Sequence, residues 1–245
     1  MSCYRVAETA FALKTVYART PRMLADYRTE EPPELTVRTT EAEIAAEGAK
    51  LEEAHSPAYV ESLLVYRKLC DYLLGKDVLL FHGSALALDG EVYLFAAPSG
   101  TGKSTHARLW RERFGPRVTM VNDDKPLLGL GAGGVTVYGS PWDGKHRLSS
   151  NIALPLKALC LLRRGERNEI RPVTAREALP ALLRQAYRPE ALARVLPLVT
   201  RLAEAVPLYE LRCNMDPEAA EVAYKGMNTE NLRMNNECVR FADDS

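Results

Sequence analysis

Apolar and polar positions along the first 75 residues predict a small α+β region. Residues 4–17 are rich in Tyr, Val, Phe, Ala and Thr, which favours one or two short strands. A further strand-like run at 35–39 follows two prolines that block a helix. The Ala- and Glu-rich segment 41–53 predicts an exposed helix. Helical spacing at 56–75 predicts a longer one, with Ser56 as its N-cap.

From residue 78 onward, apolar runs of strand length alternate with helical patterns. A tight Asp89-Gly90 turn joins the first two strands, and a glycine cluster at 131–134 turns a later hairpin. The basic segment 161–171 predicts another hairpin turn with solvated charges. The expected strands are 78–88, 91–97, 117–122, the two arms of the hairpin 125–139, 157–162 and 207–213. The expected helices are 103–114, Thr174 to about Arg184, 189–204 and 216–227.

This order of elements predicts an α/β fold, with a mixed sheet flanked by helices. We expect three parts: a small α+β region of unknown role at 1–75, an α/β domain at 76–227 and a loosely ordered tail at 228–245. The N-terminal region could recognise a substrate, mediate association into an oligomer or complete the sheet. The sequence leaves these alternatives open.

Composition excludes several classes of protein. The 32 Lys and Arg residues balance the 32 Asp and Glu residues, so no net charge attracts the chain to nucleic acid or to an anionic membrane, and neither partner is expected. The five cysteines include no CxxC pair, and Cys70 and Cys160 lie in apolar runs. This pattern disfavours disulfides and zinc and indicates a reducing, cytoplasmic location. We identify no signal peptide and no apolar run long enough to span a membrane.

The stretch AAPSGTGKST at 96–105 is the strongest chemical signal in the sequence. It departs from the phosphate-binding pattern GxxxxGK[ST] only at Ala97, which occupies the first glycine position. A predicted strand precedes it and a predicted helix follows, so backbone N–H groups and the positive helix end would face bound phosphates. Lys103 is expected on the outer phosphates and Ser104 on Mg²⁺; the alternative is an ordinary glycine turn with a capping serine. The expected nucleotide contacts are Ser99, Gly100, Thr101, Gly102, Lys103, Ser104 and Thr105.

An acidic pair, Asp123 and Asp124, follows the next apolar run. Asp123 lies 20 residues after Lys103, which leaves room for one helix and one turn in a compact βαβ unit. The loop and the acidic pair would then lie together at the carboxyl ends of parallel strands. One Asp could bind Mg²⁺ or its waters, while the other takes a proton from an attacking hydroxyl. An Asp-rich turn without chemistry is the alternative.

Three further features give weaker signals. His82 precedes the hairpin that leads into the glycine-rich loop, and it is either catalytic or structural. Lys145, His146 and Arg147 form a basic cluster in a loop, where Lys145 and Arg147 could bind phosphate or substrate or could be solvated charges. Trp142 could pack on a base or in the core.

Taken together, these residues resemble the catalytic domain of bacterial HPr kinase/phosphorylase. The resemblance rests on the order and spacing of His82, the loop at 99–104 and the acidic pair, and it covers roughly residues 78–225. The loop and the acidic pair also resemble phosphoenolpyruvate carboxykinase, whose nucleotide domain is related. The resemblance implies a P-loop-containing mixed sheet like that of the HPr kinase C-terminal domain.

The same resemblance implies an ATP- and Mg²⁺-dependent kinase that phosphorylates a serine of a protein or peptide; some relatives of this kind act on ribosomally made peptide precursors. It implies nucleotide and metal contacts at Lys103 and Ser104. It also implies serine activation and metal binding at Asp123 and Asp124, with His82 nearby. The family's later signature and its N-terminal regulatory domain have no match here, so neither the reverse phosphorylase reaction nor the ring-like hexamer is implied. A small-molecule kinase, a carboxykinase-like enzyme and a non-catalytic nucleotide-binding module stay open as alternatives.

Overall fold

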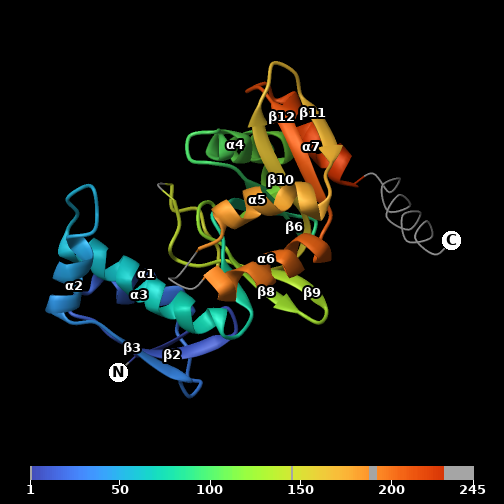
Figure 1. The fold of residues 1–245 in the computed structure, drawn as a ribbon. Coiled ribbons are helices and arrows are strands. Elements are labelled where there is room, and N and C mark those ends of the chain that lie inside the picture. The colour runs from blue at the N-terminus through green and yellow to red at the C-terminus, as the bar shows by residue number, and fades with distance from the viewer. Residues whose placement is uncertain (1, 145, 188–191, 229–245) are drawn as a thin grey trace.

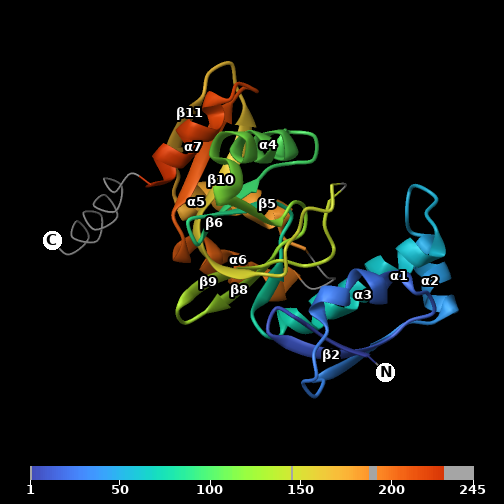
Figure 2. The same cartoon turned by 180° about the vertical axis from the view of Figure 1, so that it is seen from behind.

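The computed structural model of the chain describes residues 2–144, 146–187 and 192–228. It shows a mixed α/β protein with a small N-terminal sheet and a curled nine-stranded mixed sheet that carries helices (Figures 1 and 2). Within the described residues, no helix is both long enough and apolar enough to cross a membrane. The predicted tail lies outside the described residues, apart from Asn228 at the end of the last helix.

The N-terminal region forms the strands and helices that its sequence pattern predicts. Its long helix begins at Pro57, where the Ser56 hydroxyl accepts a hydrogen bond from the Tyr59 N–H, as an N-cap does. The helix before it is shorter than the predicted 41–53 and begins with a capping box at Thr40. The strands form a sheet in the order β1-β2-β3: β1 (Ser2–Val6), β2 (Thr9–Lys14) and β3 (Leu35–Arg38). The helical elements are α1 (Arg19–Met23), the 3₁₀ helix η1 (Ala25–Tyr27), α2 (Glu41–Gly48) and α3 (Pro57–Leu74).

The large sheet has the order β4-β8-β9-β10-β6-β5-β7, and β12 joins it by pairing with both β10 and β11. Strand β10 extends beyond the predicted 157–162. Its first residues pair antiparallel with β9, and its later residues pair parallel with β6 and β12. The strands are β4 (Val78–Leu80), β5 (Ser84–Leu88), β6 (Glu91–Ala96), β7 (Val118–Asn122), β8 (Leu127–Gly131), β9 (Gly134–Tyr138), β10 (Ala153–Arg164), β11 (Glu169–Pro172) and β12 (Leu208–Cys213).

The carboxyl ends of β6 and β7 lie at the same edge of the large sheet. β5 lies between β6 and β7 and is antiparallel to both, so β6 and β7 run the same way and their carboxyl ends meet at one edge. The predicted βαβ unit therefore forms, but its crossover passes over β5. The predicted hairpin at 161–171 is wrong, because β11 pairs with β12, which lies between it and β10.

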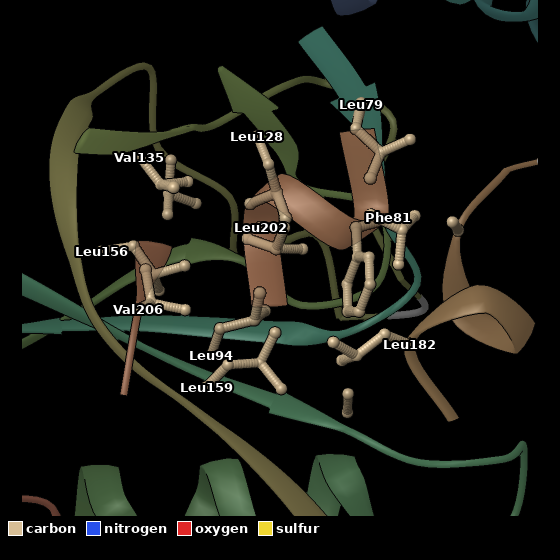
Figure 3. Packing of buried hydrophobic residues seen from close by; sticks show 14 of the residues in the cluster. Leu79, Phe81, Leu94, Leu128, Val135, Leu156, Leu159, Leu182, Leu202 and Val206 are labelled. Atoms are coloured by element: carbon tan, nitrogen blue, oxygen red, sulfur yellow. The ribbon is translucent and has the colours of Figure 1, made fainter. Parts of the chain in front are cut away.

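Helices cover both faces of the sheet. α4 packs with α7 on one face and α5 packs with α6 on the other. The buried side chains of β6 alternate accordingly: Leu94 faces α5 and α6 (Figure 3), whereas Phe95 faces α4 and α7. A capping box at Thr174 confirms the predicted helix start there. The helices are α4 (Lys103–Phe114), the 3₁₀ helix η2 (Gly115–Arg117), α5 (Ala175–Gln185), α6 (Leu192–Ala205) and α7 (Glu218–Asn228).

A third buried cluster joins the N-terminal region to the large sheet. Phe11 and Leu69 from the N-terminal region share it with Val78, Leu127 and Trp142 from the rest of the chain. Fully burying such side chains stabilises a fold by about 1.5–3 kcal/mol each. The N-terminal region is therefore anchored to the large sheet by a core that both parts share. The division of the chain at residue 75 stays a prediction.

Candidate functional site

The glycine-rich loop at 97–102 joins the carboxyl end of β6 to the first turn of α4. Gly100 and Gly102 adopt φ angles of 76° and 125°, which suit glycine because a side chain would be strained there. Gly102 is the N-cap of α4, and because glycine has no side chain, it cannot accept a hydrogen bond from the first N–H groups of the helix. The sequence prediction of a strand–loop–helix arrangement at this point is confirmed. In general, a glycine-rich loop at a helix N-terminus can present N–H groups to an anion.

Three chain segments converge at this edge of the sheet. The glycine-rich loop leaves the end of β6, the acidic pair follows the end of β7, and His82 with Gly83 precedes the start of β5. Two of these segments are hydrogen-bonded to each other: the Gly83 N–H donates to Asp124 O at 3.1 Å, and the Ser84 hydroxyl donates to Asp123 O at 3.2 Å. The segment around His82 and the acidic pair, far apart in the sequence, are therefore fixed to each other.

Asn122, the last residue of β7, orients the acidic pair. Its side chain is fully buried, and its amide nitrogen donates to Ser140 and to the carbonyl oxygen of Trp142. Its amide oxygen accepts hydrogen bonds from the backbone N–H groups of Asp124, at 2.9 Å, and Lys125, at 2.6 Å. This Asx turn fixes the backbone at which the two carboxylates diverge. The sequence analysis missed this residue, although an Asn directly before two Asp residues was a usable signal.

The two carboxylates have different environments. Asp123 Oδ1 accepts a hydrogen bond from the Gly144 N–H at 2.6 Å. Asp124 lies 3.4 Å from His82 Nε2 through Oδ1 and 2.9 Å from Lys125 Nζ through Oδ2. Hydrogen bonding to His82, followed by the charge of Lys125, holds the pKa of Asp124 far below its usual range although burial opposes the shift. Asp124 therefore stays ionised throughout the neutral range.

His82 is positioned from its other ring nitrogen. Its Nδ1 lies 2.9 Å from the Gln185 side-chain oxygen, and its backbone N–H donates to the Gln185 carbonyl oxygen. An amide oxygen can only accept, so Nδ1 carries a hydrogen, and a hydrogen bond from Nε2 to the Asp124 carboxylate requires a hydrogen on that nitrogen as well. The imidazole thus bridges the end of α5 and the acidic pair, and a catalytic role for His82 stays a prediction.

Lys103 is buried, with 8% of its surface exposed, at the start of α4. Its Nζ donates to the backbone oxygens of Ala97, at 2.7 Å, and Pro98, at 3.4 Å. Burial lowers the pKa of Lys103, and the charge of Asp124 opposes this shift. Lys103 and Asp124 are therefore close enough for their charges to interact.

Arg164, at the end of β10, contacts the glycine-rich loop and was missed in the sequence analysis, which treated its segment as a solvated turn. Its guanidinium donates to Gly100 O at 2.5 Å and to Thr101 O at 3.4 Å. Loop and arginine together line an open groove of about 430 Å³. Since β10 runs parallel to β6, its carboxyl end lies at the same edge of the sheet, but this depends on a strand order that the sequence alone leaves open.

The remaining predicted residues are only partly brought together. Ser99 and Ser104 are exposed on the loop and on α4, and Thr101 and Thr105 are half-buried beside them. Arg147 is exposed and lines an open cavity that Asp124 also lines, while Lys145 lies outside the described residues. Trp142 is buried and stacks on Tyr66 with a ring separation of 4.2 Å, so it belongs to the core and not to a base-binding surface.

The described residues contain no ready-made cage of three or more His, Cys, Asp or Glu side chains for a metal ion. They do offer oxygen donors of the kind that Mg²⁺ prefers; this ion usually binds one or two carboxylates, keeps several waters and shares phosphate oxygens with a nucleotide. Asp123 Oδ2 accepts no hydrogen bond from the described residues, and the Ser104 hydroxyl is exposed at the start of α4. The donor set therefore fits a magnesium–nucleotide complex.

Comparison with known proteins gives only a distant likeness. No protein-family model matches the chain. No curated protein matches its sequence. Among solved structures, the chain is similar to the HPr(Ser) kinase/phosphatase from Coxiella burnetii, with a TM-score of 0.39 and 10% sequence identity over 68% of this chain and 98% of that one. The likeness is distant and concerns the fold alone.

Proposed function

We propose that the chain is an ATP-dependent kinase that phosphorylates a hydroxyl, most simply that of a serine in a protein or peptide. The observation that carries the proposal is the convergence of the glycine-rich loop, the acidic pair and His82 at one edge of the sheet. Phosphoryl transfer needs phosphates held in line with an activated hydroxyl, and most of the catalysis is positioning and electrostatic stabilisation. A loop for phosphates beside an ionised carboxylate meets that requirement.

Each residue has a proposed role in this reaction. The N–H groups of residues 100–104 and the Lys103 ammonium hold the phosphates of ATP. Arg164 stabilises the loop by donating hydrogen bonds to the carbonyl oxygens of Gly100 and Thr101. Ser104 and the acidic pair, chiefly Asp123, hold Mg²⁺. When bound, Mg²⁺ neutralises charge on the phosphate oxygens.

We assign the acceptor to Asp124 because it lines the open cavity beside the acidic pair, whereas Asp123 does not, and we assign Mg²⁺ chiefly to Asp123 because its Oδ2 accepts no hydrogen bond from the described residues. The acceptor hydroxyl hydrogen-bonds to the Asp124 carboxylate. Its oxygen then forms a bond to the γ-phosphorus as the bond from phosphorus to the β–γ bridging oxygen breaks. ADP leaves with the electrons of that bond, and Asp124 takes the hydroxyl proton. His82 holds the carboxylate in place through its Nε2.

The test separates nucleotide binding from transfer. Calorimetry with Mg-ATP measures binding, and labelled ATP with a library of serine-containing peptides, read by mass spectrometry, measures transfer. Lys103→Ala should weaken ATP binding by about 10- to 150-fold, the equivalent of a lost charged hydrogen bond of about 1.5–3 kcal/mol. Asp124→Asn should leave ATP bound but lower transfer by about 10²- to 10⁴-fold.

Asp89→Asn is the matched control for the Asp124 variant. Asp89 is an exposed carboxylate in the β5–β6 turn, paired only with Arg117, and its φ of 54° is one that Asn tolerates well. This variant should bind ATP and transfer phosphate as the wild type does. An enzyme that binds Mg-ATP and phosphorylates no peptide, protein or small hydroxyl compound would contradict the proposal and leave a non-catalytic nucleotide-binding module.

A further inference from the structure

An open cavity of about 1030 Å³ leads to Asp124 between the N-terminal region and the large sheet. One wall comes from α1, η1 and the start of α3, and the other from Asp124, Lys125 and the loop at 141–151. The volume is at the upper limit of ordinary small-molecule sites, about 300–1,000 Å³. A small hydroxyl compound would leave much of such a cavity unfilled, whereas several residues of an extended peptide would fill it.

The two walls are fixed to each other by specific contacts. Tyr66 of α3 donates from its hydroxyl to Lys125 O at 2.8 Å. Trp142 stacks on the Tyr66 ring and donates from Nε1 to Ser62 O at 2.8 Å. Asn151 donates from its side chain to Asp26 O at 2.7 Å. These contacts hold the N-terminal wall in a set position relative to the acidic pair, so a ligand between the walls is positioned relative to Asp124.

The N-terminal wall carries two arginines that form no ion pair with the described residues. Arg19 and Arg22 lie three residues apart in α1, so they point to the same side of the helix. Arg19 lies over the Tyr59 ring, with its guanidinium carbon 5.4 Å from the ring centre. Arg22 is exposed. Both are therefore available to an anionic group of a ligand in the cavity.

The charge of the cavity is not uniformly positive, and this restricts the ligand. Asp26 and Asp143 also line it, and burial, with a smaller contribution from the charge of Asp123, raises the pKa of Asp143. A nucleic acid strand needs a continuous basic surface for its phosphates, and these carboxylates would repel it. A peptide with a carboxylate at one position and a neutral hydroxyl residue at another fits the observed charges.

We propose, on the basis of the proposed function, that the N-terminal region is the acceptor-binding wall of the kinase. It binds an extended acidic peptide, with the acceptor serine at Asp124 and an Asp or Glu side chain of the peptide at Arg19 and Arg22. The specificity of the enzyme then resides in α1, outside the nucleotide-binding half of the chain. Bidentate pairing of guanidinium with carboxylate supplies that specificity.

A positional peptide library tests this assignment. Each pool contains a fixed central serine and one fixed acidic or basic residue at a neighbouring position, and labelled ATP reports transfer. The wild type should prefer Asp or Glu over Lys by about tenfold or more at one or two positions. The variant Arg19→Glu/Arg22→Glu should reverse that preference to Lys. Arg38→Glu is the matched control, an exposed arginine on β3 outside this cavity, and it should keep the wild-type preference.

A binding measurement distinguishes failure of this inference from failure of the proposed function. Fluorescence anisotropy of a labelled acidic serine-peptide pool is measured in the Lys103→Ala background, where Lys103 lies outside the cavity and no transfer is needed. Loss of binding in Arg22→Glu, the exposed single change that leaves the core intact, supports the acceptor wall even if no transfer is ever detected. Transfer by the wild type with no acidic preference, unchanged in Arg22→Glu and in the double variant, overturns the inference and leaves the kinase proposal standing.

Discussion

Acidification should destabilise this protein through one buried imidazole, that of His106 in α4. The side chain is 2% exposed and packs against Phe95, with ring centres 4.6 Å apart. Trp110 Nε1 donates a hydrogen bond to His106 Nε2 at 3.0 Å. That nitrogen must therefore be unprotonated, because two N–H groups cannot face each other in a hydrogen bond. Protonation would break this contact and bury a charge whose other nitrogen, Nδ1, has no partner among the described residues.

The size of the effect follows from the pKa. Burial lowers the pKa of His106 from 6.5 to about 3. Between these two values the unfolded chain binds a proton that the folded protein does not, so stability is full above pH 6.5 and falls as the pH is lowered. The slope is about 1.4 kcal/mol per pH unit. Going from pH 7 to pH 5 should therefore remove about 2 kcal/mol of unfolding free energy. This is a large share of the 5–15 kcal/mol typical of a folded protein.

The assay is urea unfolding at pH 7 and at pH 5, followed by tryptophan fluorescence, for the wild type and for His106→Gln. Glutamine can accept the Trp110 hydrogen bond but does not titrate, so this variant should lose about 2 kcal/mol less than the wild type over the same interval. His55→Gln, at an exposed position, controls for the loss of an imidazole as such. NMR of the His106 ring provides an independent measurement. Titration of this ring near pH 6.5 in the native protein, or equal losses in wild type and His106→Gln, would refute the reasoning.

Three further predictions concern the candidate site. Gly144→Ala places a Cβ 2.7 Å from Asp123 Oδ2, so it should displace the carboxylate that we assign to Mg²⁺, weaken Mg-ATP binding measured by calorimetry and lower the transfer rate at least tenfold. His82→Ala removes the main cause of the low pKa of Asp124. The acidic limb of the pH–rate profile should therefore move to higher pH, and an unchanged limb would contradict the pairing. Arg164→Ala should speed hydrogen exchange in the glycine-rich loop and weaken ATP binding several-fold, and Arg164→Lys should not restore either.

The sequence was most informative where local patterns decide local structure. The apolar runs of β5 and β6, the caps at Ser56 and Thr174 and the helix after the glycine-rich loop all follow from patterns within a few residues. The placement of the loop at a strand end and a helix start was therefore predictable. For His82 and the acidic pair, the sequence could predict only that both lie at the same edge of the sheet. The β5–β6 hairpin and the crossover from β6 to β7 both bring the chain back to that edge.

Contacts between distant segments were not predictable in the same way. The segment after Arg164 has the turn residues of a hairpin, but β12, which comes much later in the chain, takes the place beside β10. Arg164 itself meets Gly100 across 64 residues, and Gln185 meets His82 across 103. No local spacing encodes such a pair, since the contact depends on strand order, which one sequence leaves open.

Residues 1–75 contact the backbone next to the acidic pair, and the proposed acceptor site therefore includes them. The backbone next to Asp124 is held from the strand side by Asn122 and from the N-terminal side by the Tyr66 hydroxyl on Lys125 O. Tyr66 is in turn held by the stacked Trp142, whose own backbone oxygen accepts from Asn122. A closed set of contacts therefore links α3, the end of β7 and the loop after β9. Since every member is buried or half-buried, a shift of α3 should also move the backbone next to Asp124. The glycine-rich loop lies on the other side of β5, at the end of β6. For the proposed kinase we therefore expect changes in α3 to alter transfer to the acceptor more than ATP binding.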